Sequence, residues 1–363
     1  MSITFAEKLS RLPRYEAGKH ADVARAERDV DELVKLNSNE CPWGPHPDVV
    51  EAIMQASQNL NRYPDQNSTV LRRRIAERFD AEPGAIAVGN GSCELLLAAA
   101  DALCEPGAEI LYSWPAFSMY PFLAPLSGAR EVQVPLTQDG SHDLDAMLTE
   151  ITAATQLVLI CNPNNPTATH VPAQRIGEFL EQVPDQVTVV LDEAYIEMQV
   201  NDDPDATVDL VRQFQHAVVL RTFSKIYGLA GLRVGYAICS PAFRAAVDAV
   251  RQPFSVNALA QAAAAEAIQH QDYVAERAAE ILIERVYVGE QLGELGLDTS
   301  ETQANFSWVG LGDRDEGEVV ESLARAGVLI RAGAGLGGPG HIRVTYGTRA
   351  ENEKFLAALG EAI

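Results

Sequence analysis

Short apolar runs alternate with helical patterns from about Ala85 to Cys239, and turns separate them. The runs have the length of strands, and several (VLIC, TVVLD and AVVLRTF) are almost wholly apolar. A strand that is covered on both faces lacks polar alternation, so these runs favour a mostly parallel sheet flanked by helices. We expect strands at Ile86–Val88, Glu109–Tyr112, Glu131–Val134, Gln156–Cys161, Thr188–Leu191, Ala217–Leu220 and Val234–Cys239, with intervening helices such as Cys93–Cys104 and Ala173–Gln182.

The pattern changes after Gln252, where an Ala/Glu/Arg-rich stretch from Ala258 to Leu295 predicts two helices, the second one long. Beyond it we expect a strand, a helix and two short strands, at Asn305–Val309, Gly317–Ala326, Val328–Arg331 and His341–Tyr346. A chain of 363 residues is too long for one small core. We therefore predict an α/β fold with a large domain (residues 46–255), a smaller α+β domain (256–363) joined by a long helix, and an N-terminal arm (1–45) that contributes to the small domain and the active site.

Charge and cysteine content narrow the possible partners. The chain has 51 acidic and 28 basic residues, a net charge of −23, which disfavours nucleic acid and anionic membranes as partners. The five cysteines include no C-x-x-C pair, so we expect neither a disulfide framework nor a metal site. The first 16 residues contain no apolar signal-peptide core, and no apolar run is long enough to cross a membrane. We expect a cytoplasmic protein.

The first candidate chemistry lies in a polar turn after a predicted strand. Lys225 stands in this turn, with Ser224 before it and Arg233 eight residues later. A lysine that reacts covalently must be partly desolvated and close to other cations, so that its neutral amine is populated. A hydroxyl and a guanidinium are suited to binding a phosphate. Taken alone, Lys225 is better interpreted as an ordinary loop lysine, because most lysines lie on the surface in solvent.

Two other predicted strand ends carry polar residues. Asp192 ends the run TVVLD, where open parallel sheets bind their ligands, and Tyr195 follows three residues later. A carboxylate there could keep a pyridine nitrogen protonated, although an Asp that caps a turn is common. Asn162 begins the rigid turn NPNNPT and could donate an amide hydrogen bond to the same ring, although a bare turn explains it as well.

A Gly-rich turn leads from a predicted strand into a helix at GNGSCE, so the backbone N–H groups of Ser92 and Cys93 could bind a phosphate. No Gly-Lys-Ser/Thr follows, and a leucine occupies the last glycine position of G-x-G-x-x-G. Nucleotide binding is therefore a weak alternative.

Taken together and in this order, the motifs resemble those of the fold-type I aminotransferases that use pyridoxal 5′-phosphate (PLP). Within them the chain resembles the histidinol-phosphate aminotransferase family. The likeness covers nearly the whole chain, in the segments KLNSNECPWGPHP (Lys35–Pro47), RYPD, GNGSCE, NPNNPT, DEAY, SK…LAGLRVGY and IRA…HIRVTYGTRAEN.

The resemblance implies roles for the cofactor site. Lys225 would hold PLP covalently and act as the catalytic base, and Asp192 would pair with the pyridine nitrogen. Tyr195 and Asn162 would face the phenolic oxygen of the ring. The residues that would bind the cofactor by stacking or through its phosphate are Phe117, Ser92, Cys93, Ser224 and Arg233. Tyr63 would reach the cofactor phosphate of a neighbouring subunit, which implies a homodimer with shared active sites.

For substrates, the resemblance implies contacts from Tyr15, Asn162, Arg331 and Arg343. The two arginines stand at the ends of short predicted strands on either side of a Gly-rich turn, so adjacent strands could aim both inward to bind an anion. The implied reaction is L-histidinol phosphate and 2-oxoglutarate to imidazole acetol phosphate and L-glutamate. An aromatic amino acid aminotransferase and a PLP lyase, such as a threonine-phosphate decarboxylase, remain alternatives. A regulator built on this fold would need an added DNA-binding module.

Three positions depart from the family pattern. Cys93 stands where Asp or Asn is usual, Phe117 where Tyr is common, and Ala168 where Gly follows the asparagine turn. None of the three removes a group that the chemistry requires.

Overall fold

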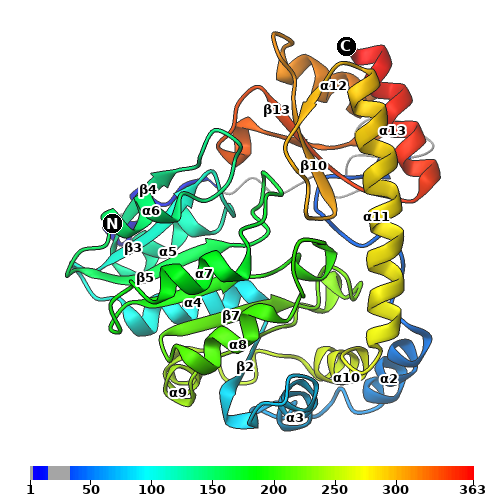
Figure 1. Cartoon of the computed structure of the whole chain (residues 1–363). Coiled ribbons are helices and arrows are strands. Elements are labelled where there is room, and N and C mark those ends of the chain that lie inside the picture. The colour runs from blue at the N-terminus through cyan, green and yellow to red at the C-terminus, as the bar shows by residue number, and fades with distance from the viewer. Residues whose placement is uncertain (1–2, 15–32) are drawn as a thin grey trace.

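The computed structural model describes residues 3–14 and 33–363. Its central element is a seven-stranded sheet in the order β2-β8-β7-β6-β5-β3-β4 (Figure 1). The strands are β2 (Ile86–Gly89), β3 (Glu109–Trp114), β4 (Arg130–Pro135), β5 (Thr155–Cys161), β6 (Thr188–Asp192), β7 (Ala217–Thr222) and β8 (Gly235–Ile238). All neighbouring pairs are parallel except those of β8, which runs antiparallel to β2 and β7. The prediction of seven strands in a mostly parallel sheet is confirmed.

The alternation of buried residues along each strand assigns the helices to the two faces of this sheet. Val189 and Leu191 belong to one hydrophobic cluster and Val190 to the other, because successive side chains point to opposite faces. α7 (Ala173–Leu180) and α8 (Ala206–Gln213) cover the first face, and α4 (Ser92–Leu103), α5 (Tyr120–Ser127) and α9 (Pro241–Val250) cover the second. The remaining α-helices of this part are α2 (Pro47–Ser57), α3 (Thr69–Arg78), α6 (Leu144–Thr149) and α10 (Ala258–Ala267).

The C-terminal part is built on a four-stranded antiparallel sheet, β12-β13-β10-β9, and α11 (Gln271–Glu294) runs from α10 to this sheet (Figure 1). Its strands and further α-helices are β9 (Asp298–Thr299), β10 (Phe306–Gly310), α12 (Glu316–Arg325), β11 (Val328–Leu329), β12 (Arg331–Ala332), β13 (His341–Thr345) and α13 (Arg349–Ala362). The two predicted helices between Ala258 and Leu295 are confirmed. Within the described residues, no helix combines the length and apolar character that crossing a bilayer requires.

One predicted strand was wrong. The run Val328–Arg331 is divided into β11 and β12, which belong to different sheets. β11 pairs in parallel with β1 (Val34–Lys35) of the N-terminal arm, whereas β12 pairs with β13. The chain changes partner at Ile330, so the hydrogen bonds of the two halves go to different elements. The pairing with β1 links the arm to β11, and the division into domains stays a prediction.

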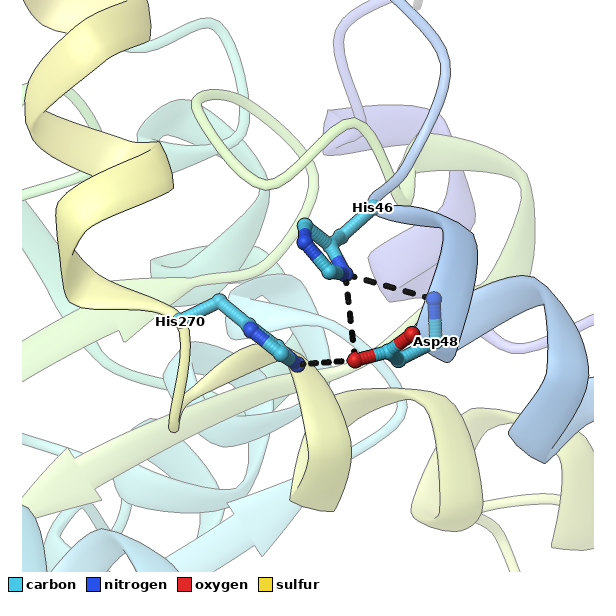
Figure 2. A group of neighbouring side chains, drawn as sticks. All are labelled: His46, Asp48 and His270. Carbon is cyan, nitrogen blue, oxygen red and sulfur yellow. Dashed lines mark hydrogen bonds and ion pairs between the residues drawn. The ribbon is translucent and has the colours of Figure 1, made fainter.

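A group of three polar side chains joins the start of α2 to the start of α11 (Figure 2). The rings of His46 and His270 stack with centroids 3.9 Å apart and planes 18° apart, and one oxygen of Asp48 lies 3.7 Å from a nitrogen of each ring. The lone pairs of nearly parallel rings run side by side, so one metal ion cannot lie in both ring planes. We interpret the group as a packing contact.

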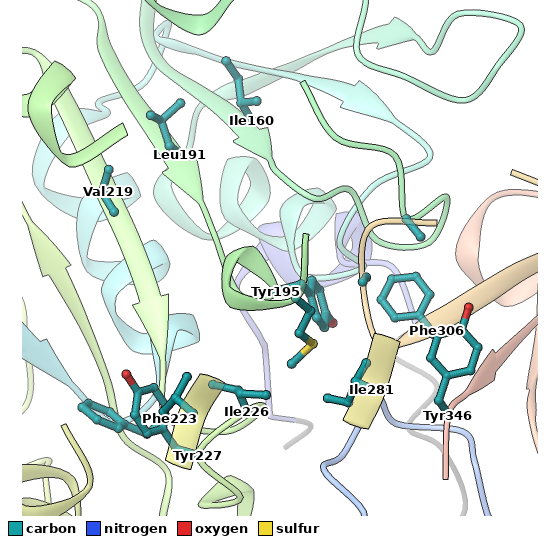
Figure 3. Close-up of a cluster of buried hydrophobic side chains, with 14 of the residues drawn as sticks. Ile160, Leu191, Tyr195, Val219, Phe223, Ile226, Tyr227, Ile281, Phe306 and Tyr346 are labelled. Atoms are coloured by element: carbon teal, nitrogen blue, oxygen red, sulfur yellow. The ribbon is translucent and has the colours of Figure 1, made fainter. Parts of the chain in front are cut away.

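A continuous hydrophobic cluster connects the two parts of the molecule (Figure 3). It extends from Leu191 in the sheet through Tyr195 to Phe306 and Ile281 in the small domain. The rings of Tyr195 and Phe306 meet edge to face, with centroids 5.1 Å apart. This packing fixes the small domain against the carboxyl ends of the parallel strands.

Candidate active site

A cavity of about 320 Å³ lies between the carboxyl ends of the parallel strands and the small domain. Most of the predicted site residues line it: Ser92, Cys93, Phe117, Asp192, Tyr195, Ser224, Lys225, Arg233, Arg331 and Arg343. Asn162 and Tyr63 do not line it, and Tyr15 lies outside the described residues. The N-terminal arm adds Asn37, Ser38 and Asn39. Segments that are far apart in the sequence therefore converge on one site.

Lys225 lies in the turn after β7, and its Nζ donates a hydrogen bond to the carbonyl of Ser38 at 3.0 Å. Burial lowers the pKa of Lys225 to about 8, and the Arg343 guanidinium adds to this effect. An amine with such a pKa is partly neutral near neutral pH, as a nucleophile or a general base must be.

Asp192 ends β6 and is buried, and the hydroxyl of Tyr120 donates to its Oδ2 at 3.1 Å. Its Oδ1 is also buried and has no hydrogen-bond partner among the described residues. Burial raises the pKa of Asp192 to about 7. A buried carboxylate oxygen without a partner is rare in proteins, and a cationic N–H donor at Oδ1 would stabilise the ionised form.

Tyr195 is oriented by the N-terminal arm. The Nδ2 of Asn39 donates to the Tyr195 hydroxyl at 3.0 Å. The Thr345 hydroxyl in turn donates to Oδ1 of Asn39 at 3.1 Å. Asn39 adopts a left-handed backbone conformation (φ 53°), which asparagine tolerates better than most residues. The segment Lys35–Pro47, which contains Asn39, gives no local sign of this contact.

One end of the cavity is suited to a phosphate. Gly91 (φ 77°) precedes α4, and a Cβ at this position would lie 2.6 Å from Nη2 of Arg233. Nη1 of Arg233 donates to the Ser224 hydroxyl at 3.4 Å. The guanidinium, this hydroxyl and the first N–H groups of α4 thus meet at one point, a favourable arrangement for an anion. Burial raises the pKa of the neighbouring Cys93 thiol, so its side chain stays neutral.

At the small-domain side of the cavity, Arg331 of β12 and Arg343 of β13 are directly opposite each other in the antiparallel sheet. Arg343 is buried and donates to Oδ1 of Asn165 at 2.5 Å and to the carbonyl of Asn37 at 3.0 Å. The predicted arrangement, two arginines aimed inward from adjacent strands, is what the structure contains. Such a pair can bind carboxylate or phosphate.

Asn162 corrects the sequence analysis. It is fully buried, its amide donates to the carbonyl of Val171 at 2.9 Å, and its Oδ1 accepts from the Val171 N–H at 2.8 Å. Both amide atoms therefore close the turn, and Asn165 lines the cavity in its place. The motif contains three asparagines, and its spacing alone does not reveal which of them forms hydrogen bonds within the turn. The sequence likewise contains no sign that the Tyr120 hydroxyl donates to Asp192.

Tyr63 lies away from the cavity. Its side chain is 83% exposed, and its ring stacks on Phe254 at 4.7 Å. It contributes nothing to the cavity of its own chain.

Comparisons with known proteins match the whole of this architecture. The model of the family described as aminotransferase class I and II matches residues 31–359. The histidinol-phosphate aminotransferase of Moorella thermoacetica is 41% identical over 359 residues, which covers 98% of this chain and 92% of the relative. The aromatic amino acid aminotransferase of Streptomyces coelicolor is 40% identical over 349 residues, 96% of this chain and 94% of the relative. The crystal structure of histidinol-phosphate aminotransferase from Sinorhizobium meliloti in complex with pyridoxal-5′-phosphate aligns with a TM-score of 0.89 and 29% identity, covering 99% of this chain and 97% of that one.

Proposed function

The chain belongs to the class I and II aminotransferase family, and on this premise we propose that it is a PLP-dependent enzyme that transfers an amino group between L-histidinol phosphate and 2-oxoglutarate. The observation that carries the proposal is the cavity in which Lys225, Asp192 and the Arg331–Arg343 pair face a common space. Relatives named histidinol-phosphate aminotransferase at about 40% identity over nearly the full length support the choice of substrate.

The residues present fit PLP. The unpartnered Oδ1 of Asp192 suits the N–H of a pyridinium ring, and the α4 N-terminus with Ser224 and Arg233 suits a phosphate. Phe117 lines the cavity and offers a ring for stacking, and Tyr195 and Asn165 offer polar groups to the phenolic oxygen. When bound, PLP supplies a carbonyl that condenses with amines and a protonated ring that withdraws electrons from the substrate α-carbon.

Lys225 has two proposed tasks. Its neutral amine would hold the cofactor covalently and, once free, would accept a proton from the α-carbon of the amino donor. The hydrogen bond to the Ser38 carbonyl holds Nζ inside the cavity. Asp192 would keep a proton on the ring nitrogen, and the Tyr120 hydroxyl orients that carboxylate.

Arg331 and Arg343 are proposed to bind the anionic groups of the substrates. Glutamate carries two carboxylates, whereas histidinol phosphate carries a phosphate and no α-carboxylate, so the site must accept both kinds of anion. Two guanidinium groups side by side can bind either of them bidentately. An aromatic amino acid aminotransferase would use the same core, and relatives of that name at 40% identity make it the second candidate.

We further propose a homodimer in the cytoplasm. α2 and α3, together with the segment between them, carry exposed apolar side chains, a property of protein interfaces. They are Val50, Met54, Leu60, Tyr63 and Val70. In this proposal Tyr63 serves the active site of the second subunit. The five unpaired cysteines support a reducing compartment.

A half-reaction test separates the candidates. The PLP-loaded protein is mixed in turn with histidinol phosphate, phenylalanine and threonine phosphate, and the cofactor absorbance is followed without a 2-oxo acid. We expect the fastest conversion with histidinol phosphate and no release of CO₂. A preference for phenylalanine would favour the aromatic aminotransferase, and CO₂ release from threonine phosphate would favour a lyase.

A further inference from the structure

A loop from Gly333 to Gly340 joins β12 to β13 and so connects the strands of Arg331 and Arg343. It contains a short 3-10 helix, Ala334–Leu336, and Leu336 lines the cavity with only 3% of its surface exposed. Among the described lining residues beyond position 256, Leu336 is the one apolar side chain, and the other two are the arginines. The loop therefore brings a hydrophobic contact into an anion-binding wall.

A single carboxylate holds both ends of this loop. Glu316, at the start of α12, accepts from the N–H of Ala334 at 3.0 Å through Oε1 and from the N–H of Gly340 at 2.7 Å through Oε2. Within the loop, the N–H of Gly338 donates to the carbonyl of Gly333 at 3.0 Å. With both ends tied to one side chain, the loop has little freedom to move Leu336.

Two tryptophans pack closely against the loop. A Cβ on Gly337 would lie 2.6 Å from the indole of Trp114, and one on Gly338 would lie 2.5 Å from the indole of Trp308. Trp114 ends β3 of the large sheet, whereas Trp308 belongs to β10 of the small domain. The loop is thus packed across the junction of the two domains, where only glycine allows so close an approach.

We propose that Leu336 is a specificity-determining residue that contacts the flat ring of an amino donor, and that Glu316 is a positioning residue that holds it there. This inference rests on the proposed aminotransferase function. Leucine offers only dispersion and apolar contact, which a planar ring uses over its whole face. Glutamate has two methylene groups between charged ends and depends on the arginines instead. The loop therefore raises selectivity for ring-bearing donors over glutamate.

The test compares kcat and KM for histidinol phosphate, phenylalanine and glutamate in matched variants. Leu336→Ala raises KM for the ring-bearing donors and lowers their kcat/KM roughly tenfold, as expected for lost side-chain contact, with kcat and the glutamate parameters little changed. Leu336→Met, which keeps the volume, stays close to wild type. Glu316→Ala gives the pattern of Leu336→Ala, and Glu316→Gln, which retains one acceptor, gives a weaker form of it.

Glu318→Gln is the control, because Glu318 lies exposed in the same turn of α12. Gly337→Ala displaces the loop from the Trp114 side and gives the same KM pattern, which keeps the test informative if Glu316→Ala does not fold.

Equal losses for ring-bearing donors and glutamate, or an unchanged KM in Leu336→Ala, overturn the inference while the function stands. If the wild type accepts phenylalanine but not histidinol phosphate, the proposed substrate is wrong. The role of the loop is then tested by the KM for phenylalanine in the same variants. If it accepts neither ring-bearing donor, both proposals fail.

Discussion

Tyr120 and Asp192 form a buried pair in which the phenol hydroxyl donates to Oδ2 of the carboxylate at 3.1 Å. Because Oδ2 is occupied in this way, the carboxylate is oriented, and Oδ1 is the oxygen left for a ligand. We expect Asp192→Asn to fold and to bind PLP but to lose roughly 10²–10³-fold in turnover, since an amide cannot stabilise a pyridinium charge. Stopped-flow half-reactions measure this. Near-normal turnover in a PLP-loaded Asp192→Asn would assign the residue a structural role.

Asn162 and Asn165 of the turn separate an effect on folding from an effect on catalysis. Asn162→Ala leaves the N–H and carbonyl of Val171 unpaired in the core, so we expect a loss of about 2 kcal/mol or more in the free energy of unfolding. Asn165→Ala removes a partner of Arg343 from the cavity and should lower kcat/KM by roughly 10–100-fold, the effect of one charge-assisted hydrogen bond. Urea titrations and steady-state kinetics on both variants test the contrast, which a reversed pattern would contradict.

The buried Lys225 should lower the free energy of unfolding of the PLP-free protein by an amount that depends on pH. Its pKa is about 8 in the fold against 10.5 for the free side chain, so between pH 8 and 10.5 the unfolded chain holds a proton that the folded chain has released. The cost is absent above pH 10.5 and is complete below pH 8. Lys225→Met should therefore be more stable than wild type by about 3 kcal/mol at pH 7, and the difference should shrink as pH rises from 8 to 10.5. Urea unfolding at pH 7 and 9.5 measures it, and a constant difference would rule the explanation out.

Arg331 and Arg343 should differ in their effects on the two substrates. Arg343 is buried and bonded to Asn165 and the Asn37 carbonyl, so Arg343→Ala should impair both glutamate and histidinol phosphate. Arg331→Ala should reduce kcat/KM for histidinol phosphate, by about 2–5 kcal/mol, more than for glutamate. Small and equal effects of Arg331→Ala on both substrates would favour the aromatic aminotransferase.

Tyr63 tests the shared active site through hybrid dimers. Tyr63→Phe should weaken PLP affinity several-fold, because one hydrogen bond is lost. When this variant exchanges subunits with Lys225→Ala, a Tyr63 that serves its partner yields one site with both defects and one intact site. Titration of the hybrid with PLP should then reveal a site of wild-type affinity. If only weakened sites are found, Tyr63 serves its own subunit, and a fully active monomer would end the proposal.

Local sequence patterns determined the elements of this protein. Apolar runs at strand length predicted all seven strands of the central sheet, because burial on both faces leaves a mark on every residue of the run. Local patterns also predicted the site residues Lys225, Asp192 and Arg233. They stand at strand ends or in turns that the sequence marks with glycine and polar residues. Since the carboxyl ends of parallel strands meet at one edge, their convergence on one cavity followed from the predicted topology.

Only the tertiary structure decided which atoms meet. Asn162 and Asn165 belong to one motif, yet one closes the turn on Val171 and the other meets Arg343, a residue of the distant β13. The division of Val328–Arg331 into two strands likewise depends on β1 and β13, which lie far away in the sequence. A residue's own neighbours set its conformational preference, whereas its hydrogen-bond partners are chosen by packing between remote segments, and no local pattern records that choice.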